Sequence, residues 1–144
     1  MTRLEFQQIA LLRLDEAETL LAQDKYDGCC YLAGYALESA LKAAICHNMD
    51  NDDFFDVLKS ETARAFKIHN LAELVILAGL STEYKDLNTK NSILLSNWEC
   101  IKNDIKWSEQ LRYQIGFTEI EAKTMINAIN DPLNGILKWI RKFW

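Results

Sequence analysis

The chain has 144 residues, of which 49% are hydrophobic and 26% are charged, and this globular composition argues against an intrinsically disordered protein. One Pro and five Gly are too few for the many turns of a β-sandwich or β-barrel, so long helices are favoured. The net charge of −5 disfavours a protein that coats nucleic acid, although 16 Lys and Arg residues are enough for a local basic site.

The cellular location of the protein and the redox state of its thiols are predicted from features that the sequence lacks. The sequence shows no secretory signal and no apolar run near the roughly 20 residues that a membrane-spanning helix needs. Its four cysteines contain no C-x-x-C pair and only two histidines are present, so no structural zinc site is expected. We therefore predict a cytoplasmic protein without membrane contact, metal or cofactor, in which the thiols are buried and reduced.

The first half of the chain predicts two long helices. Apolar residues at helical spacing indicate a helix over about residues 2–23, with Arg13 inside the apolar stripe. Two explanations of Arg13 are open: a long stem that reaches the helix edge, or a buried cation reserved for an anionic partner. After a break at residues 24–28, Asp27 is expected to cap a second helix over about 28–47.

The second predicted helix has two different faces. One face is wide, apolar and rich in alanine, which allows neighbouring helices to approach closely. The other face carries a single ridge, at spacings of four, three and four residues, formed by Tyr31, Tyr35, Glu38 and Lys42. This ridge is either a solvated face with a Glu38–Lys42 pair and tyrosines that cover a neighbour, or a polar groove for a base and a phosphate.

The rest of the chain predicts shorter elements. Periodicity and capping signals indicate one or two helical turns at 54–58, a loop or irregular helix at 60–68, a turn of helix at 81–87, and helices at about 70–79, 91–102 and 118–131. In residues 104–116 the apolar side chains fit the alternation of a strand as well as the period of a helix. Pro132 should kink or break the last helix before residues 133–144. The predicted fold class is all-α: one domain over residues 1–144, an up-and-down bundle of about five helices with a kinked C-terminal helix.

Three segments resemble the HEPN domain family. Residues 25–43, with the sequence KYDGCCYLAGYALESALKA, are similar to the second helix of HEPN domains. The segments HNL at 69–71 with AGL at 78–80, and WSEQLRY at 107–113, resemble two shorter family elements. This resemblance spans nearly the whole chain. It implies a helical bundle, commonly a homodimer, that cleaves RNA or binds nucleotides and is often encoded beside a minimal nucleotidyltransferase in toxin–antitoxin or phage-defence loci.

The resemblance also implies a catalytic motif, because active ribonucleases of this family carry Arg-x4–6-His. Arg64 and His69 match this spacing: a neutral imidazole can accept the 2′-hydroxyl proton of RNA, and the arginine can stabilise the phosphorane. Alternatively, His69 only orders the loop before Asn70. The second candidate is Arg112, which no histidine follows within the next residues, so a site built on Arg112 would be a degenerate nuclease.

Three functions therefore stay open at the level of the sequence. The leading hypothesis is an RNA- or nucleotide-binding component of a toxin–antitoxin or phage-defence system, with a nucleotidyltransferase-type partner. The alternatives are a non-catalytic protein-interaction module and an active metal-independent ribonuclease that uses Arg64 and His69. Surplus apolar surface and four tryptophans predict a homodimer. The candidate binding residues are Tyr31, Tyr35, Glu38, Lys42, Arg112 and Tyr113.

Overall fold

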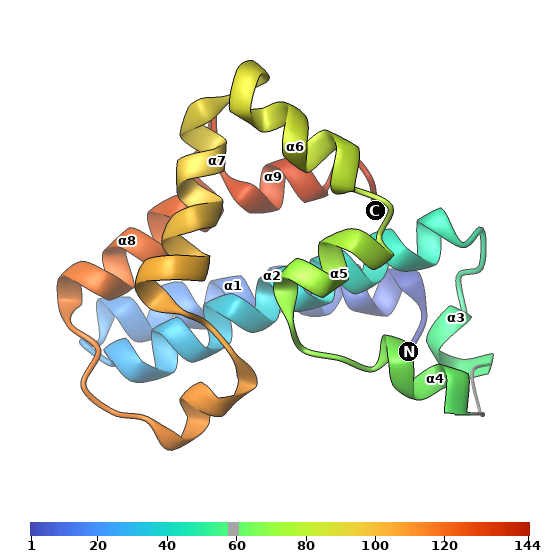
Figure 1. Ribbon diagram of the computed structural model, residues 1–144. Coiled ribbons are helices and arrows are strands. Elements are labelled where there is room, and N and C mark those ends of the chain that lie inside the picture. The colour runs from blue at the N-terminus through green and yellow to red at the C-terminus, as the bar shows by residue number, and fades with distance from the viewer. Residues whose placement is uncertain (58–60) are drawn as a thin grey trace.

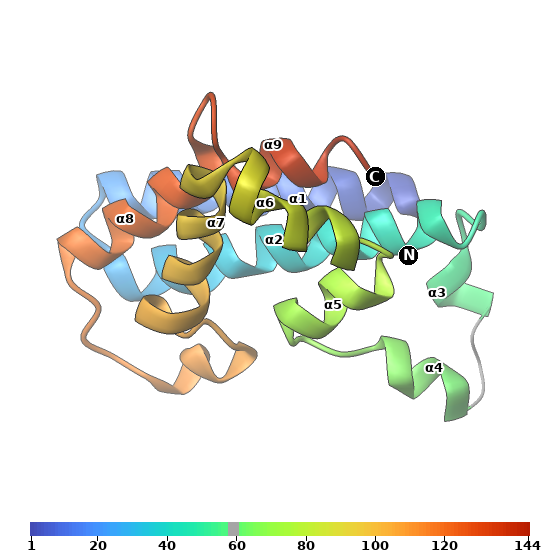
Figure 2. The same cartoon turned by 45° about the horizontal axis from the view of Figure 1, so that its top comes forward.

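The computed structural model describes residues 1–57 and 61–144, and the regular elements of these residues are all helical, which confirms the all-α prediction. Two long helices, α1 (Arg3–Ala22) and α2 (Tyr26–Asn48), lie side by side as an antiparallel hairpin (Figures 1 and 2). The other helices are α3 (Phe54–Val57), α4 (Glu61–Phe66), α5 (Leu71–Leu77), α6 (Ser81–Lys90), α7 (Ser92–Glu99), the π-helix η1 (Cys100–Ile105), the 3₁₀-helix η2 (Glu109–Tyr113), α8 (Glu119–Asn130) and α9 (Ile136–Ile140).

The hairpin forms the core because both helices bury one continuous apolar side. The N-terminus of α1 is closed by a capping box, in which the Thr2 side chain accepts from the N–H of Glu5 and the Glu5 carboxylate accepts from the N–H of Thr2. The alanine-rich face of α2 is fully buried, and α2 packs against α1, α5, α8, α9 and η2. The short alanine side chains permit these close approaches, as the sequence predicts.

Two polar residues of the hairpin resolve open questions from the sequence. Arg13 is half-exposed and pairs with Glu16 one turn further along α1, so its long stem reaches the helix edge. Asp27 does not cap α2, and that prediction was wrong. The helix already begins at Tyr26, and the Asp27 carboxylate instead accepts the backbone N–H groups of Gly116 (3.0 Å) and Phe117 (2.7 Å).

A second group of helices lies on one side of the hairpin. Figure 1 shows α6, α7 and α9 together there, with α7 steeply inclined to α2. Asn70 caps α5 by accepting from the N–H of Glu73 at 3.1 Å, and Gly79 ends this turn with φ +73°, as predicted. The predicted apolar turn at 54–58 is α3, which ends at Val57; residues 58–60 lie outside the described residues.

The segment that the sequence left ambiguous contains two unusual turns. The helix expected over 91–102 ends as α7 at Glu99 and continues as the π-helix η1, which Lys106 ends in the left-handed conformation (φ 55°, ψ 47°). A π turn inserts one extra residue into the helix, so a pattern of 3.6 residues per turn cannot predict it. The alternating stretch after it is the 3₁₀-helix η2 between two extended segments.

The C-terminal region is broken at Pro132, as predicted. Thr118 and Glu121 form the expected capping box at the start of α8. After α8, Asp131 accepts from the N–H groups of Leu133 and Asn134, and only the short helix α9 follows. The bundle therefore has more and shorter helices than the five expected. None of the helices in the described part of the chain has the length and apolar character that crossing a bilayer requires.

Candidate functional site

The ridge of α2 carries a buried ion pair. Glu38 is only 4% exposed, and Lys42, one turn further along, donates from Nζ to Glu38 Oε1 at 2.6 Å. The Lys42 side chain is itself 12% exposed. A carboxylate so deeply buried needs partners for both of its oxygens. The ammonium of Lys42 is therefore committed to Glu38 rather than displayed to solvent, unlike the phosphate contact that the sequence suggested for it.

The second oxygen of Glu38 holds His69. The Nδ1–H of His69, in the loop before α5, donates to Glu38 Oε2 over 2.9 Å, because a carboxylate can only accept. This bond fixes the tautomer and leaves Nε2 as the free ring nitrogen. The His69 side chain is 42% exposed, so the imidazole is accessible from solution. A carboxylate behind a half-exposed imidazole is a common arrangement for a general base.

Trp107 joins the segment before η2 to this ridge. Its indole N–H donates to the backbone oxygen of Tyr31 at 3.1 Å, and its ring lies edge-on to Tyr35 with centroids 5.3 Å apart. The ring also rests on Gly34, where an added Cβ would come within 2.0 Å of the indole. Glycine is therefore required at residue 34 by close approach, and this contact positions η2 beside α2.

Arg112, on η2, lies near the same ridge. Burial, followed by the neighbouring Tyr31, raises the pKa of Tyr35, and the charge of Arg112 acts in the opposite direction. The pKa of Glu109 is lowered first by a hydrogen bond from the Gln110 side chain, and the nearby charge of Arg112 acts in the same direction. The exposed Arg112 guanidinium also lies 5.2 Å from the ring centre of Tyr113, which is 76% exposed.

These contacts define the α2 polar cluster, which consists of Tyr31, Tyr35, Glu38, Lys42, His69, Glu109 and Arg112. The fold thus brings Arg112 to the ridge that helix spacing alone could not connect with it. Arg64 lies exposed on α4, and the described contacts of His69 are with Glu38 and Tyr35. Sequence spacing placed Arg64 and His69 in one motif, and that pairing stays a prediction.

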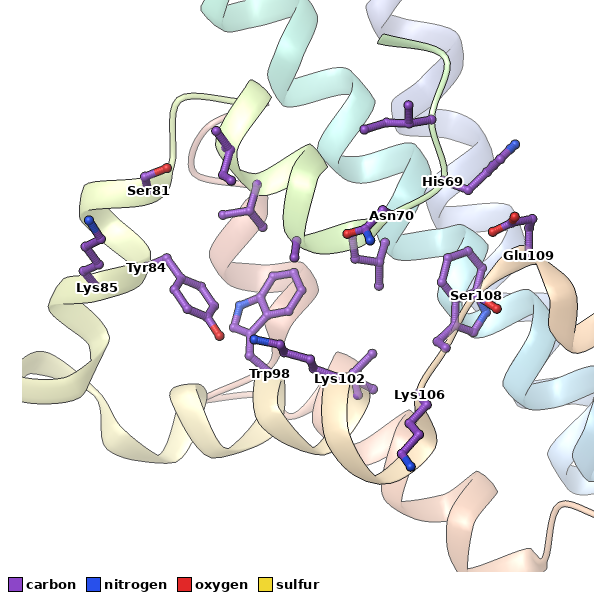
Figure 3. A pocket seen from close by; sticks show the side chains of 17 residues that line it. His69, Asn70, Ser81, Tyr84, Lys85, Trp98, Lys102, Lys106, Ser108 and Glu109 are labelled. Atoms are coloured by element: carbon purple, nitrogen blue, oxygen red, sulfur yellow. The ribbon is translucent and has the colours of Figure 1, made fainter. Parts of the chain in front are cut away.

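A cavity of about 900 Å³ adjoins the cluster (Figure 3). His69, Asn70 and Glu109 line one end of it, and α5, α6, α7 and η1 supply the other walls. No pattern in the sequence predicted this cavity. The signal that could have indicated it is the regular spacing of Trp98, Lys102 and Lys106, four residues apart, but the turn from α7 into a π-helix obscures which face they share.

Outside the α2 polar cluster, the described residues contain no second acid–base centre and no metal centre. In residues 1–57 and 61–144, no group of three or more His, Cys, Asp or Glu side chains is placed to hold a metal ion. The other histidine, His47, accepts at Nδ1 from the Arg3 guanidinium at 3.1 Å, since arginine has no acceptor. The four cysteines are free; three are buried and Cys100 is partly exposed.

Comparison with known proteins supports one family. The family model of the HEPN domain matches residues 5–52, which include most of α1 and all of α2. No curated protein and no solved structure matches the chain. The matched region contains the whole ridge from Tyr31 to Lys42, whereas His69 and Arg112 lie beyond it. The HEPN resemblance that the sequence indicated is thereby confirmed over residues 5–52, on an all-α fold of the kind the family implies.

Proposed function

We propose that this chain binds single-stranded RNA at the α2 polar cluster and cleaves it without a metal ion. The observation that carries the proposal is the Glu38–His69 contact, which leaves Nε2 of a half-exposed imidazole as the free base. The exposed Arg112 guanidinium supplies the cation for a phosphate, and the neighbouring Tyr113 ring supplies a face for a base.

The proposed reaction is an internal transesterification. Nε2 of His69 takes the proton of the 2′-hydroxyl, and the 2′-oxygen attacks the adjacent phosphorus. The bond from phosphorus to the 5′-oxygen breaks, and that oxygen takes a proton from water and leaves as a hydroxyl, while His69 returns its proton to the solvent. The products are a 2′,3′-cyclic phosphate and a 5′-hydroxyl end. Arg112 stabilises the charge that develops on the phosphorane oxygens. Arg64 is the alternative cation, since it matches the family spacing.

Cleavage of a labelled single-stranded RNA in the presence of a chelator tests this proposal. Replacement His69→Ala should reduce the rate about 10²- to 10⁴-fold, the usual contribution of a general base. His47→Ala is the matched control and should leave the rate unchanged, because His47 contacts Arg3 at the far end of α2. The same oligonucleotide with a 2′-deoxy linkage should resist cleavage. Equal rates in His69→Ala and the wild type would exclude His69 as the base.

Binding is measured separately, so that a degenerate nuclease can be recognised. Arg112→Glu should abolish RNA binding with the helical circular-dichroism signal unchanged, and added salt should weaken binding by the wild type. If Arg64→Glu has that effect and Arg112→Glu has none, the phosphate site lies on α4 instead. RNA binding without any cleavage would retain the binding function and remove the catalytic step.

A second candidate function, the docking of a partner protein, is favoured by apolar side chains around the loop before α8. Tyr113, Ile115 and Ile120 are each more than three-quarters exposed, and Ile115 reaches 92%. Exposed apolar groups that lie close together often mark interfaces. Substitution Ile115→Glu should then abolish capture of the partner and leave RNA cleavage intact.

The assembly and the biological setting follow from the family resemblance. We propose a cytoplasmic homodimer in a toxin–antitoxin or phage-defence system, with a nucleotidyltransferase-type partner. The apolar face of α2 is buried within the chain, so the dimer contact must use other apolar surface. Light scattering at micromolar concentration should report about twice 16.6 kDa. Purification of a tagged chain from its native cell, with an adjoining nucleotidyltransferase, tests the partner.

A further inference from the structure

The cavity beside the α2 polar cluster has a composition that RNA binding does not explain. Its walls are largely apolar: α5 contributes Leu71, Ala72 and Val75 along one side, and Ile101 closes another. At about 900 Å³ it has the size of pockets that enclose small organic molecules. An apolar cavity of this volume, open to solvent, is suited to the body of a small ligand.

Cations gather at the rim of this cavity in a chain that is acidic as a whole. Lys85, Lys102 and Lys106 line it from α6, η1 and the residue after η1, and all three are exposed. None of the three forms an ion pair within residues 1–57 and 61–144, whereas Lys42, Lys90 and Lys123 do. Figure 3 shows Lys102 extending across the cavity toward Tyr84. These unpaired ammonium groups provide charge for an anionic head group.

The wall between these lysines contains a polar group without a partner. Trp98 is 4% exposed, and within the described residues its indole N–H is a buried side-chain donor that has no hydrogen-bond partner. Buried donors are usually paired, so an unpaired one requires an explanation. The Trp98 ring packs edge-on to Tyr84 with centroids 6.0 Å apart, and Figure 3 shows its nitrogen edge on the Tyr84 side of the cavity. Burial raises the pKa of Tyr84, so its hydroxyl stays protonated and can donate.

The backbone around this wall is also unusual. Lys102 belongs to the π-helix η1, and Lys106 adopts the left-handed conformation that non-glycine residues rarely take. Short π-helical stretches and such strained residues concentrate at ligand sites, where the surrounding structure stabilises the strained backbone. Here both features carry the lysines of the rim.

We propose that this cavity binds a small amphipathic organic anion, with its apolar body along α5 and its head group between Lys85, Lys102 and the Tyr84 hydroxyl. The head-group site stands apart from the proposed RNA site, because neither lysine belongs to the α2 polar cluster, although His69 and Glu109 of that cluster line the other end of the cavity. A carboxylate, a sulfonate or a phosphate fits this site equally, because their shared chemistry is one compact negative charge on an apolar body.

Two naphthalene probes with the same body test this proposal. The anionic probe 1-anilinonaphthalene-8-sulfonate should bind the folded chain at one saturable site, detected by its fluorescence. Lys102→Gln should weaken this binding about tenfold, as expected for loss of one charged contact. The neutral analogue N-phenyl-1-naphthylamine should be unaffected by Lys102→Gln. Octanoate should displace the anionic probe, whereas inorganic phosphate alone should not.

Matched variants locate the probe. Lys123→Gln removes an exposed lysine of α8 that does not line the cavity, and should change nothing. Ala72→Trp fills the cavity from an exposed position of α5 and should prevent binding of both probes. Equal effects of Lys102→Gln and Lys123→Gln, or undiminished binding in Ala72→Trp, would overturn the proposal. So would a wild-type dimer that Ala72→Trp dissociates, since the cavity would then be filled by a second copy.

A further variant separates this site from the proposed RNA site. Arg112→Ala should leave binding of the sulfonate probe unchanged while it weakens RNA binding. Loss of both activities in Arg112→Ala would show a single shared site and would overturn the independent ligand site.

Discussion

The α1–α2 hairpin and the segment over residues 61–113 are built in opposite ways. The hairpin consists of two long helices whose buried faces repeat regularly, and its contacts are mainly with each other. The later segment consists of short helices, one π-helix and one 3₁₀-helix, with Lys106 in a left-handed turn. The hairpin supplies a rigid surface, and the short elements bring His69 and Arg112 to it.

The hairpin therefore stabilises the fold, and the later segment completes the candidate site. On the hairpin, Glu38 is buried among helices, yet its two oxygens serve one partner from the hairpin and one from the later segment. The carboxylate is therefore the point at which the two regions meet. Substitutions at this junction should have larger effects than substitutions in either region alone.

The largest effect is expected from Glu38→Ala. It leaves the Lys42 ammonium buried without its carboxylate, which should lower the free energy of unfolding by about 3–5 kcal/mol. The double variant Glu38→Met with Lys42→Met removes both charges and should regain most of this stability, because an apolar pair fits a buried position. Urea unfolding measures both.

The double variant also separates the contribution of Glu38 to stability from its contribution to RNA cleavage. It should fold and yet cleave RNA poorly, since His69 has lost the partner that fixes its tautomer. A double variant as unstable as Glu38→Ala would show that the carboxylate is needed by the hairpin itself.

The next effect concerns the contact of Trp107 with α2. Gly34→Ala places a Cβ about where the indole now lies, so Trp107 must move, at a cost of about 1–3 kcal/mol in unfolding free energy. Gly28→Ala is the matched control on the same helix. Its Cβ meets only the flexible end of Leu20 at 3.1 Å, and alanine favours the helix, so the change should stay within about 1 kcal/mol.

Tryptophan fluorescence during unfolding reports both glycine variants. Because Trp107 positions η2, Gly34→Ala should also weaken RNA binding through Arg112, whereas Gly28→Ala should not. Equal stability of the two variants would mean that η2 is only loosely held against the hairpin.

The hairpin was predictable from sequence because its information is local. Apolar residues recur at helical spacing, and the ridge from Tyr31 to Lys42 follows from the spacing alone. The cap of α5 by Asn70 and the break at Pro132 are equally local signals. The family match, at residues 5–52, lies in this same region.

The site was predictable only in part because its remaining contacts join residues far apart in the chain. The bond from His69 to Glu38 spans 31 positions, and that from Trp107 to Tyr31 spans 76. No spacing rule indicates either one. The pairing of Arg64 with His69 rests on local spacing alone and stays a prediction, whereas the ring of His69 contacts Glu38 and Tyr35 of α2. The expected cap at Asp27 was wrong because its carboxylate is taken by a loop 89 residues away, which no local pattern indicates.

A smaller effect on RNA cleavage should distinguish the N-terminal caps of α5 and α8, which Asn70 and Thr118 form in the same way. Asn70→Ala and Thr118→Ala each remove a side-chain acceptor at a helix N-terminus, and each should cost about 1 kcal/mol of unfolding free energy. Only Asn70 adjoins His69, so only Asn70→Ala should also slow RNA cleavage. Comparable cleavage by the two variants at matched stability would argue that the loop before α5 does not position the imidazole.

The smallest effect at neutral pH is expected from the cysteines of the hairpin. Burial raises the pKa of Cys29 to about 11 and that of Cys30 to about 12, so both stay protonated and should react slowly with a thiol reagent until the protein unfolds. Cys100 is partly exposed, although burial raises its pKa as well, and it should react first.

The same raised pKa values determine whether the free energy of unfolding rises or falls with pH in the alkaline range. Above a pH of about 9 the unfolded thiols lose their protons while the folded ones keep theirs, so the unfolded state binds fewer protons and stability falls as pH rises. Below that pH the two states bind equal numbers of these protons and the cysteines add no slope. The double variant Cys29→Ala with Cys30→Ala should flatten the decline of unfolding free energy between about pH 9 and 11. An unchanged decline would place its origin in other groups whose pKa is raised by burial, of which Tyr35 is the first to test.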